Sequence, residues 1–258
     1  MKVRALVSRV LVGVMAVSAV GVGPVLANAP SPKEAKSSSE SERAYRYELR
    51  ALGAYAGEAI FQIGVEEEVG KRTLRPIRID AHTAGLAANF LNGKTMSTTW
   101  VDKTWMPVRA RWDQVLDKVK RVVKASFEAK KVKGTDDRDG KTFAKIDLDT
   151  AARGLDLVSV FSWLMHTDLS PGAKYQIPVF DGRRIYDLAV TVGIAKELQV
   201  PVGFRQAIPV QIKVTRGEYK RDVELWLSAE KDRTPLKLVF KYGLLGTVEA
   251  SLVGEKKG

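Results

Sequence analysis

The sequence IPVFDGRRIYDLAV, residues 177–190, places an Asp-Gly dipeptide between two runs of apolar residues. Asp-Gly is a preferred pair in tight turns, because aspartate and glycine tolerate the positive φ angles that such turns need. Apolar residues on both sides make the pair a strong signal for a β-hairpin. We therefore predict two antiparallel strands joined at Asp181–Gly182, and we expect the rest of the chain to follow the same antiparallel pattern.

Runs with strand character continue on both sides of this hairpin. Near the start, Tyr45, Tyr47 and Leu49 alternate with charged residues, which is the period of two typical of a half-buried strand. Short turns separate the runs, as expected for strands that follow one another in an antiparallel sheet. The predicted strands cover Arg43–Leu52, Glu58–Glu67, Thr73–His82, Tyr175–Phe180, Arg184–Ile194, Ile208–Val214, Val223–Ser228, Leu236–Tyr242 and Thr247–Val253.

Two short helices are predicted between the strands. The first covers Thr83–Leu91, with Thr83 as its cap. The second follows Asp156, whose carboxylate can cap it, and ends before the Ser-Pro-Gly sequence at 170–172. Its apolar stripe, at helical spacing, consists of Leu157, Val160, Phe161, Leu164 and Met165.

Residues 112–134 fit two interpretations. In a helix, Asp113 would cap a stripe of valines that begins at Val115. In strands, the apolar residues up to Phe127 alternate with lysines, and Asp139–Gly140 marks a further tight turn. Periodicity alone does not decide between the two. The whole pattern predicts a mainly β fold of the α+β type: a curved antiparallel sheet or an open β-barrel with one or two short helices.

The N-terminal part of the chain predicts export. Residues 1–27 contain basic residues, then an apolar run, then a cleavage site that follows Ala27, which is the order of a secretory signal. Residues 28–42 are mostly Ser, Pro, Lys and Glu, so we expect a disordered linker before a single β-rich domain at 43–258. The alternative is an uncleaved anchor, because the run approaches the roughly 17 residues that span a bilayer. We expect cleavage, and therefore a periplasmic or secreted protein.

Composition narrows the class further. The 258 residues include no cysteine, so the fold must be held by its own core, and attachment of lipid to an N-terminal cysteine is excluded. The formal net charge is +12, and loss of Lys2, Arg4 and Arg9 with the signal would leave +9. A basic exported protein is attracted to anionic polymers and lipid headgroups. The alternative is that the lysines only keep the surface soluble.

Motifs for catalysis, cofactors and metals fail on spacing or charge. GTDDRDGKT at 134–142 has five residues between its glycines, where a phosphate-binding loop has four, and its aspartates would repel phosphate. A calcium loop would need carboxylates where Thr135 and Ile146 stand. His82 and His166 are the only histidines, too few for a usual nitrogen and sulfur metal site. We expect no cofactor and no metal, assign no catalytic residue, and favour a non-enzymatic protein.

A group of aromatic and basic side chains predicts a binding surface. Three tryptophans are interleaved with arginines, so that aromatic faces could stack on a ligand while cations attract its anionic groups. The alternative is that the tryptophans belong to the core and rim of a sheet. No nucleic-acid-binding signature is present, and we expect no nucleic-acid partner. The predicted ligand-binding residues are Trp100, Trp105, Arg109, Arg111 and Trp112, with Arg183 and Tyr186 at the hairpin.

Three segments resemble a known family of exported bacterial proteins, the domain-of-unknown-function family 3108. They are YELRALGAYAGEA at 47–59, FSWLMHTDLSPGAKYQIPVFDGRRIYDLAV at 161–190 and LWLSAEKDRTPLKLVFKYGLLGTVEASL at 225–252. The Pro-Val-Phe-Asp-Gly-x-x-x-Tyr-Asp hairpin is the most specific part. The resemblance implies a periplasmic or envelope setting, an antiparallel sheet like that of lipoprotein carriers, and strands at Trp112–Phe127. It implies no established reaction, and a likeness of fold does not determine function.

Together these features predict a cell-envelope protein that binds or carries an amphipathic or anionic ligand: a lipid, a lipoprotein or an anionic glycan. Two alternatives remain open. One is an enzyme that acts on an envelope polysaccharide, with carboxylates, His166 or Tyr186 as acid and base. The other is a structural partner in an envelope protein complex.

Overall fold

The computed structural model describes residues 42–90, 92–217, 219–241 and 246–257, and these form one large antiparallel sheet. The predicted signal (1–27) and nearly all of the predicted linker (28–42) lie outside the described residues. The strands are β1 (Arg43–Ala51), β2 (Ala54–Ile63), β3 (Glu67–Val69), β4 (Arg72–Thr83), β5 (Gly93–Val101), β6 (Pro107–Leu116), β7 (Val119–Phe127), β8 (Lys131–Arg138), β9 (Lys141–Asp149), β10 (Leu155–Asp156), β11 (Lys174–Phe180), β12 (Ile185–Val192), β13 (Lys196–Val200), β14 (Gly203–Arg216), β15 (Tyr219–Ser228), β16 (Pro235–Lys241) and β17 (Thr247–Lys257). The helices are α2 (Gly85–Phe90) and α3 (Ser159–His166).

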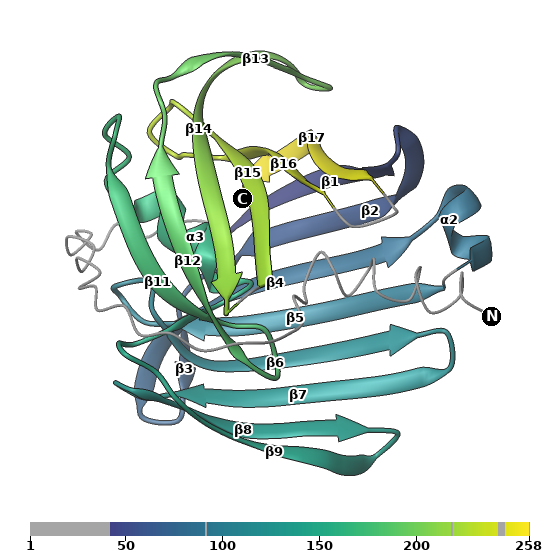
Figure 1. Cartoon of the computed structure of the whole chain (residues 1–258), viewed down its shortest axis with the longest axis vertical. Helices are drawn as coiled ribbons and strands as arrows, with labels where there is room; N and C mark the ends of the chain where they lie inside the picture. The colour runs from purple at the N-terminus through teal and green to yellow at the C-terminus, as the bar shows by residue number, and fades with distance from the viewer. Residues whose placement is uncertain (1–41, 91, 218, 242–245, 258) are drawn as a thin grey trace.

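The sheet is curved and open. From one edge, β9, hydrogen-bonded neighbours follow in the order β8, β7, β6, β5, β4, β2, β1, β17, β16, β15, β14, β12 and β11. The short strand β3 pairs with β4, and the short strand β13 pairs with β14, both antiparallel. Strand β10 pairs with β11 in parallel. Because β11 and β9 do not pair, the sheet is not closed into a barrel (Figure 1). The predicted curved antiparallel sheet is therefore confirmed.

Alternation of side chains builds the inner face of the sheet. In β1, Tyr45, Tyr47 and Leu49 are buried, whereas Arg46 and Arg50 are exposed, as the period of two predicts. β1 pairs with β2 on one side and with the C-terminal strand β17 on the other. The first and last strands thus meet in the middle of the sheet.

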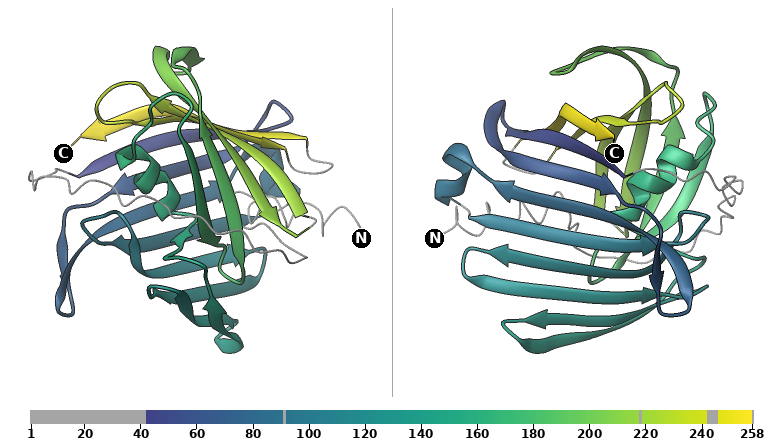
Figure 2. Two further views of the ribbon diagram at one scale, coloured as in Figure 1. Left: turned by 60° about the vertical axis from the view of Figure 1, so that its left-hand side comes forward. Right: turned by 180° about the vertical axis from the view of Figure 1, so that it is seen from behind.

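Helix α3 lies inside the curve of the sheet, as Figure 2 shows. The helix begins at Ser159, and the Asp156 carboxylate accepts the backbone N–H groups of Val158 (3.2 Å) and Ser159 (2.7 Å). Asp156 therefore serves the start of the helix as predicted. Its other oxygen accepts the hydroxyl of Thr99 on β5 at 2.5 Å, which ties the helix to the sheet.

Residues 112–127 form strands rather than a helix. They contribute to β6 and β7, which are joined by a turn at Asp117, where φ is +54°. Val115 and Val119 of the expected helical stripe are exposed, whereas Phe127 is buried. The helical interpretation is wrong because the neighbouring strand β5 offers hydrogen bonds along the full length of β6.

The remaining predictions hold in outline. The hairpin at Asp181–Gly182 is confirmed as the β11–β12 connection, with Gly182 at φ +95° and the Asp181 N–H bonded to the Arg184 carbonyl (3.0 Å). Helix α2 begins at Gly85, two residues after the predicted cap. Thr83 instead ends β4, and its hydroxyl accepts the Gly93 N–H (2.9 Å). Strands β3, β5, β10 and β13 were not predicted.

Candidate ligand-binding pocket

An apolar pocket lies between α3 and the inner face of the sheet. Its space of about 630 Å³ includes a part that is open to solvent. Strands from both ends of the chain contribute, because β1 and β17 are neighbours. The lining residues are Tyr47, Leu49, Ala59, Phe61, Ile79, Ala81, Leu157, Phe161, Leu225, Pro235, Lys237, Leu238 and Ala250.

The polar atoms in this lining already have partners. The Tyr47 hydroxyl donates to the Pro235 carbonyl (2.7 Å), and burial raises the pKa of Tyr47 well above its ordinary value. The Lys237 ammonium pairs with Glu249 at 2.9 Å. What the pocket offers a ligand is therefore apolar surface, and the favourable term for binding is burial of an apolar group.

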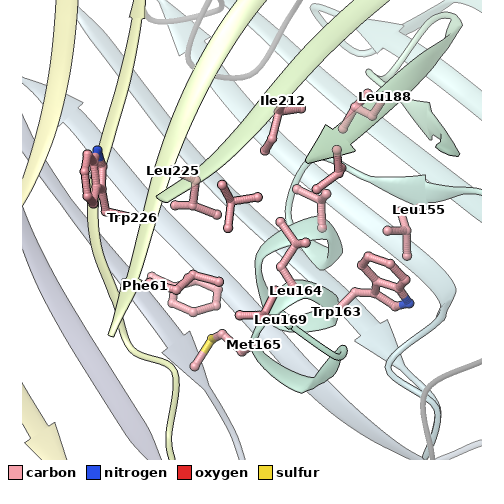
Figure 3. Packing of buried hydrophobic residues seen from close by; sticks show 14 of the residues in the cluster. Phe61, Leu155, Trp163, Leu164, Met165, Leu169, Leu188, Ile212, Leu225 and Trp226 are labelled. Atoms are coloured by element: carbon pink, nitrogen blue, oxygen red, sulfur yellow. The ribbon is translucent and has the colours of Figure 1, made fainter. Parts of the chain in front are cut away.

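Helix α3 provides one wall of the pocket through Leu157, just before it, and Phe161. The ring of Phe161 lies 6.1 Å from the ring of Phe61 on β2. Figure 3 shows Phe61 and Leu225 to one side of the helix, which carries Leu164. Leu164 belongs to the same apolar stripe as Phe161 and is fully buried, so the pocket lies beside a packed part of the helix.

The loop after β5 holds the far end of α3. Trp105 in this loop stacks on His166 of the helix, with 3.5 Å between ring centroids and 11° between the planes. The Arg75 guanidinium lies 5.3 Å from the same tryptophan ring. In the loop itself, Asp102 accepts hydrogen bonds from Thr104 and pairs with Arg153 at 2.7 Å. Trp105 is thus part of the packing that holds the helix in place.

The β11–β12 hairpin tip covers a second part of the inner face. Phe180 is fully buried against Trp112 and Phe127, which are 5.7 and 6.0 Å away between ring centroids. A Cβ atom on Gly182 would lie 2.6 Å from the Trp112 ring, so only glycine fits there. The Gly182 carbonyl accepts a hydrogen bond from Arg121 on β7 (3.1 Å).

The structure divides the predicted binding residues among four places. Trp100, Arg109 and Arg111 lie together on the outer face of β5 and β6. There Arg109 lies 5.3 Å from the Trp100 ring, and Arg111 pairs with Asp113 at 2.7 Å. The indole N–H of Trp100 donates to Glu67 (2.6 Å).

The other predicted residues lie on the inner side. Trp105 is buried beside α3, and Trp112 is buried under the hairpin tip. Arg183 is part-exposed at the tip itself. Tyr186 is buried on β12 against Tyr219 (5.9 Å), and burial raises its pKa to about 12. None of the seven lines the apolar pocket.

The groups named for acid and base catalysis lie on separate elements. His166 is on α3, with its Nδ1 at 2.7 Å from the Ser162 carbonyl oxygen, and Tyr186 is on β12. Asp147 and Asp149 are exposed on β9, and both pair with Lys131. Within the described ranges, no group of three or more His, Asp or Glu side chains could hold a metal ion.

Sequence reasoning identified the strands that line the pocket but not the pocket. Tyr47 and Leu49 were expected on a buried face, which the structure confirms. The local sequence does not show that these side chains border a pocket, because the pocket depends on how far α3 lies from the sheet. No described helix is both long and apolar enough to span a membrane.

Fold and site together define an open, curved antiparallel sheet with an internal helix and an apolar pocket beside it. The chain belongs to the family described as "Protein of unknown function (DUF3108)", whose model matches residues 45–253. Among curated proteins, none matches the chain.

A solved structure shows the same architecture. A β-barrel-like protein of Brucella abortus, from the domain of unknown function DUF1849, superimposes with a TM-score of 0.60 at 14% identity, over 85% of this chain and 98% of that one. A Bacteroides fragilis protein assigned as exported, with a YmcC-like fold, gives a TM-score of 0.34 at 9% identity (84% and 96% covered). A Parabacteroides distasonis protein assigned as a lipoprotein gives 0.36 at 7% identity (84% and 96% covered). The first likeness concerns the fold alone, and the other two carry no argument about function.

Proposed function

We propose that the protein is exported to the cell envelope, where it binds or carries an amphipathic ligand, a lipid or the acyl chain of a lipoprotein, without catalysing a reaction. The observation that carries the proposal is the apolar pocket between α3 and the sheet. Its hydroxyl and ammonium groups are bonded within the protein, so an apolar chain would leave no polar group unsatisfied. The predicted signal at residues 1–27 supports the location.

Two alanines provide a direct test of the pocket. Ala59 lines it from β2, whereas Ala44 lies on the opposite face of the neighbouring strand β1. Ala59→Phe would fill the space, and Ala44→Phe adds the same side chain on the outer face. We expect Ala59→Phe to weaken binding of a fluorescent fatty acid at least about tenfold, which corresponds to about 1.4 kcal/mol. Ala44→Phe should leave it unchanged.

Native mass spectrometry of protein purified from a bacterial periplasm supplies the second measurement. We expect a co-purified lipid on the wild-type protein and on Ala44→Phe, and its loss from Ala59→Phe. A clean apo mass together with no fatty-acid binding by the wild-type protein would disprove the proposal. Recovery of a stable protein complex from membranes in place of lipid would favour the structural-partner alternative.

The outer surface formed by Trp100, Arg109 and Arg111 is a second candidate, for an anionic glycan. The observation in its favour is that β5 and β6 place the indole beside the Arg109 guanidinium, with Arg111 on the same outer face. Trp100→Ala in the same experiments distinguishes the two candidates. Loss of binding on a glycan array, with fatty-acid binding intact, would assign the glycan to this surface.

A further inference from the structure

Arginines gather where the β11–β12 hairpin tip meets β7 and β8. Arg121 comes from β7, Arg138 from the end of β8, and Arg183 from the loop of the hairpin. All three lie around a single carboxylate, Asp136, whose side chain is 1% exposed. We call these four residues the arginine cluster. One buried carboxylate faces three cations, so the cluster carries surplus positive charge.

Arg121 alone satisfies the buried carboxylate. Its Nε and Nη2 atoms lie 2.8 and 3.2 Å from the two oxygens of Asp136, which is the paired geometry of a strong ion pair. Its remaining N–H groups donate to Gln114 (3.1 Å) and to the Gly182 carbonyl (3.1 Å). Arg121 therefore neutralises Asp136 and docks the hairpin tip without help from the other two arginines.

Arg138 and Arg183 approach the same carboxylate without bonding to it. Each has a nitrogen 3.6 Å from Oδ2 of Asp136, which is beyond hydrogen-bond distance. The Nε of Arg138 is buried and has no hydrogen-bond partner among the described residues. Burial, followed by repulsion from Arg138, lowers the pKa of Arg183. Both guanidinium groups thus keep donors that the described residues do not use.

The side chain of Phe143 orients these two groups. Phe143 is the extra residue where the β8–β9 register shifts, and it is 55% exposed. The Arg138 guanidinium lies 3.7 Å from its ring and that of Arg183 lies 5.5 Å away. Stacking on an aromatic ring restricts a guanidinium while its N–H edge stays free to bond. The exposure of Phe143 and Arg183 shows that solvent reaches this point.

The loop of the hairpin is also held without using its cations. The Asp181 carboxylate accepts the backbone N–H groups of Arg183 and Arg184, both at 2.8 Å. This bonding determines the loop conformation and leaves the Arg183 side chain to face Arg138. The geometry therefore provides two fixed guanidinium groups, one aromatic neighbour and access from solvent.

We propose that Arg138 and Arg183 bind a phosphate-type oxyanion, either a free phosphate group or the phosphate of a lipid headgroup. Planar guanidinium groups match the spacing of phosphate oxygens, and two of them can share one anion. The anion would accept hydrogen bonds from the N–H donors that do not bond to Asp136. It would also offset the surplus positive charge of the arginine cluster. This site is separate from the apolar pocket and does not depend on it, because the two share no lining residue.

The test measures binding of inorganic phosphate by calorimetry, and of phosphatidic-acid vesicles by flotation, with phosphatidylcholine vesicles as the neutral comparison. The variants are Arg138→Gln, Arg183→Gln and the double variant. The matched control is Arg78→Gln, an exposed arginine on β4. We expect each single variant to weaken binding at least about tenfold, and the double variant to abolish it. The control should bind as the wild type does.

The two arms distinguish the sources of the phosphate. Binding of inorganic phosphate that the double variant loses supports a site for a soluble anion. Binding of phosphatidic-acid vesicles alone, lost in the same way, supports a lipid headgroup. Three results would overturn the proposal. They are equal binding by the wild type and the double variant, an equal loss of binding in the Arg78→Gln control, and no binding in either arm. Denaturation curves of all variants check folding, and fatty-acid binding should be unaffected because the pocket is separate.

Discussion

Two regions of the same inner face differ in what covers them. Beside α3 the sheet meets a helix whose buried residues are mostly apolar, and an apolar pocket remains between them. Under the β11–β12 hairpin tip the sheet presents Trp112 and Phe127 together with Arg121, Asp136 and Gln114. The strands alternate in both regions. The covering element therefore determines the chemistry that the sheet must supply.

Backbone hydrogen bonding explains this difference. A helix bonds its own N–H and C=O groups internally, so its side can lie on apolar residues without polar partners. A turn leaves backbone groups that need partners when they are buried. The Gly182 carbonyl is such a group, and Arg121 supplies its donor (3.1 Å). Once an arginine is present, a buried carboxylate is needed beside it, and Asp136 fills that role.

The largest effect is expected from loss of the helix packing. Trp163 is 1% exposed on α3 and packs edge-on against Tyr175, with 5.5 Å between ring centroids. Trp163→Ala should lower the free energy of unfolding by about 3–5 kcal/mol, because it leaves a large cavity in the main core. Urea denaturation followed by circular dichroism measures the change. A loss below about 1 kcal/mol would show that α3 does not contribute to the core as described.

A smaller effect is expected at the hairpin tip. Gly182→Ala places a Cβ 2.6 Å from the Trp112 ring and also strains a backbone at φ +95°. Gly172→Ala is the matched control, because its φ is +83° but no atom lies within 4 Å of the new Cβ. We expect a loss of about 1 kcal/mol for the control, from backbone strain alone. Gly182→Ala should lose about 1–3 kcal/mol more, from overpacking.

The difference between these two glycine variants isolates the docking of the tip. Equal losses in unfolding free energy would mean that the tip does not press on Trp112. In that case the proposed phosphate site would also be contradicted, because the same contact of the tip holds Arg183 next to Arg138.

The smallest effect concerns the pH dependence of the Asp156 carboxylate. Burial raises the pKa of Asp156, against the hydrogen bonds from Thr99 and Ser159 that lower it. The folded protein therefore holds this proton more tightly than the unfolded chain, so this group costs stability as the pH rises above its ordinary value of 3.8. Asp156→Asn removes this dependence while keeping an acceptor for the helix.

The comparison is made as the unfolding free energy of the wild type minus that of Asp156→Asn. We expect this difference to fall as the pH rises from below 3.8 through the raised pKa of Asp156, and to be constant above that value. Denaturation curves at several pH values measure it. A difference that rises with pH would show that hydrogen bonding outweighs burial at this residue.

The sequence by itself determined most of the strands and, where side chains alternate, which of them are buried. Alternation is a local property, so Tyr45, Tyr47 and Leu49 could be placed on an inner face without knowing any partner strand. The turn at Asp181–Gly182 was equally local, because its dihedral angles suit those two residues. The role of Asp156 just before α3 was also local, because its carboxylate bonds to N–H groups two and three residues along the chain.

Only the tertiary structure decided which of these elements meet. β1 pairs with β17 across most of the chain length, and Arg121 reaches Gly182 from another strand. Alternation also divided the predicted tryptophans, since Trp100 and Trp112 fall on opposite faces of β5 and β6. The apolar pocket and the arginine cluster both depend on contacts between residues distant in the chain. Local periodicity carries no information about such contacts, because strand pairing and sheet curvature are determined by packing of the whole molecule.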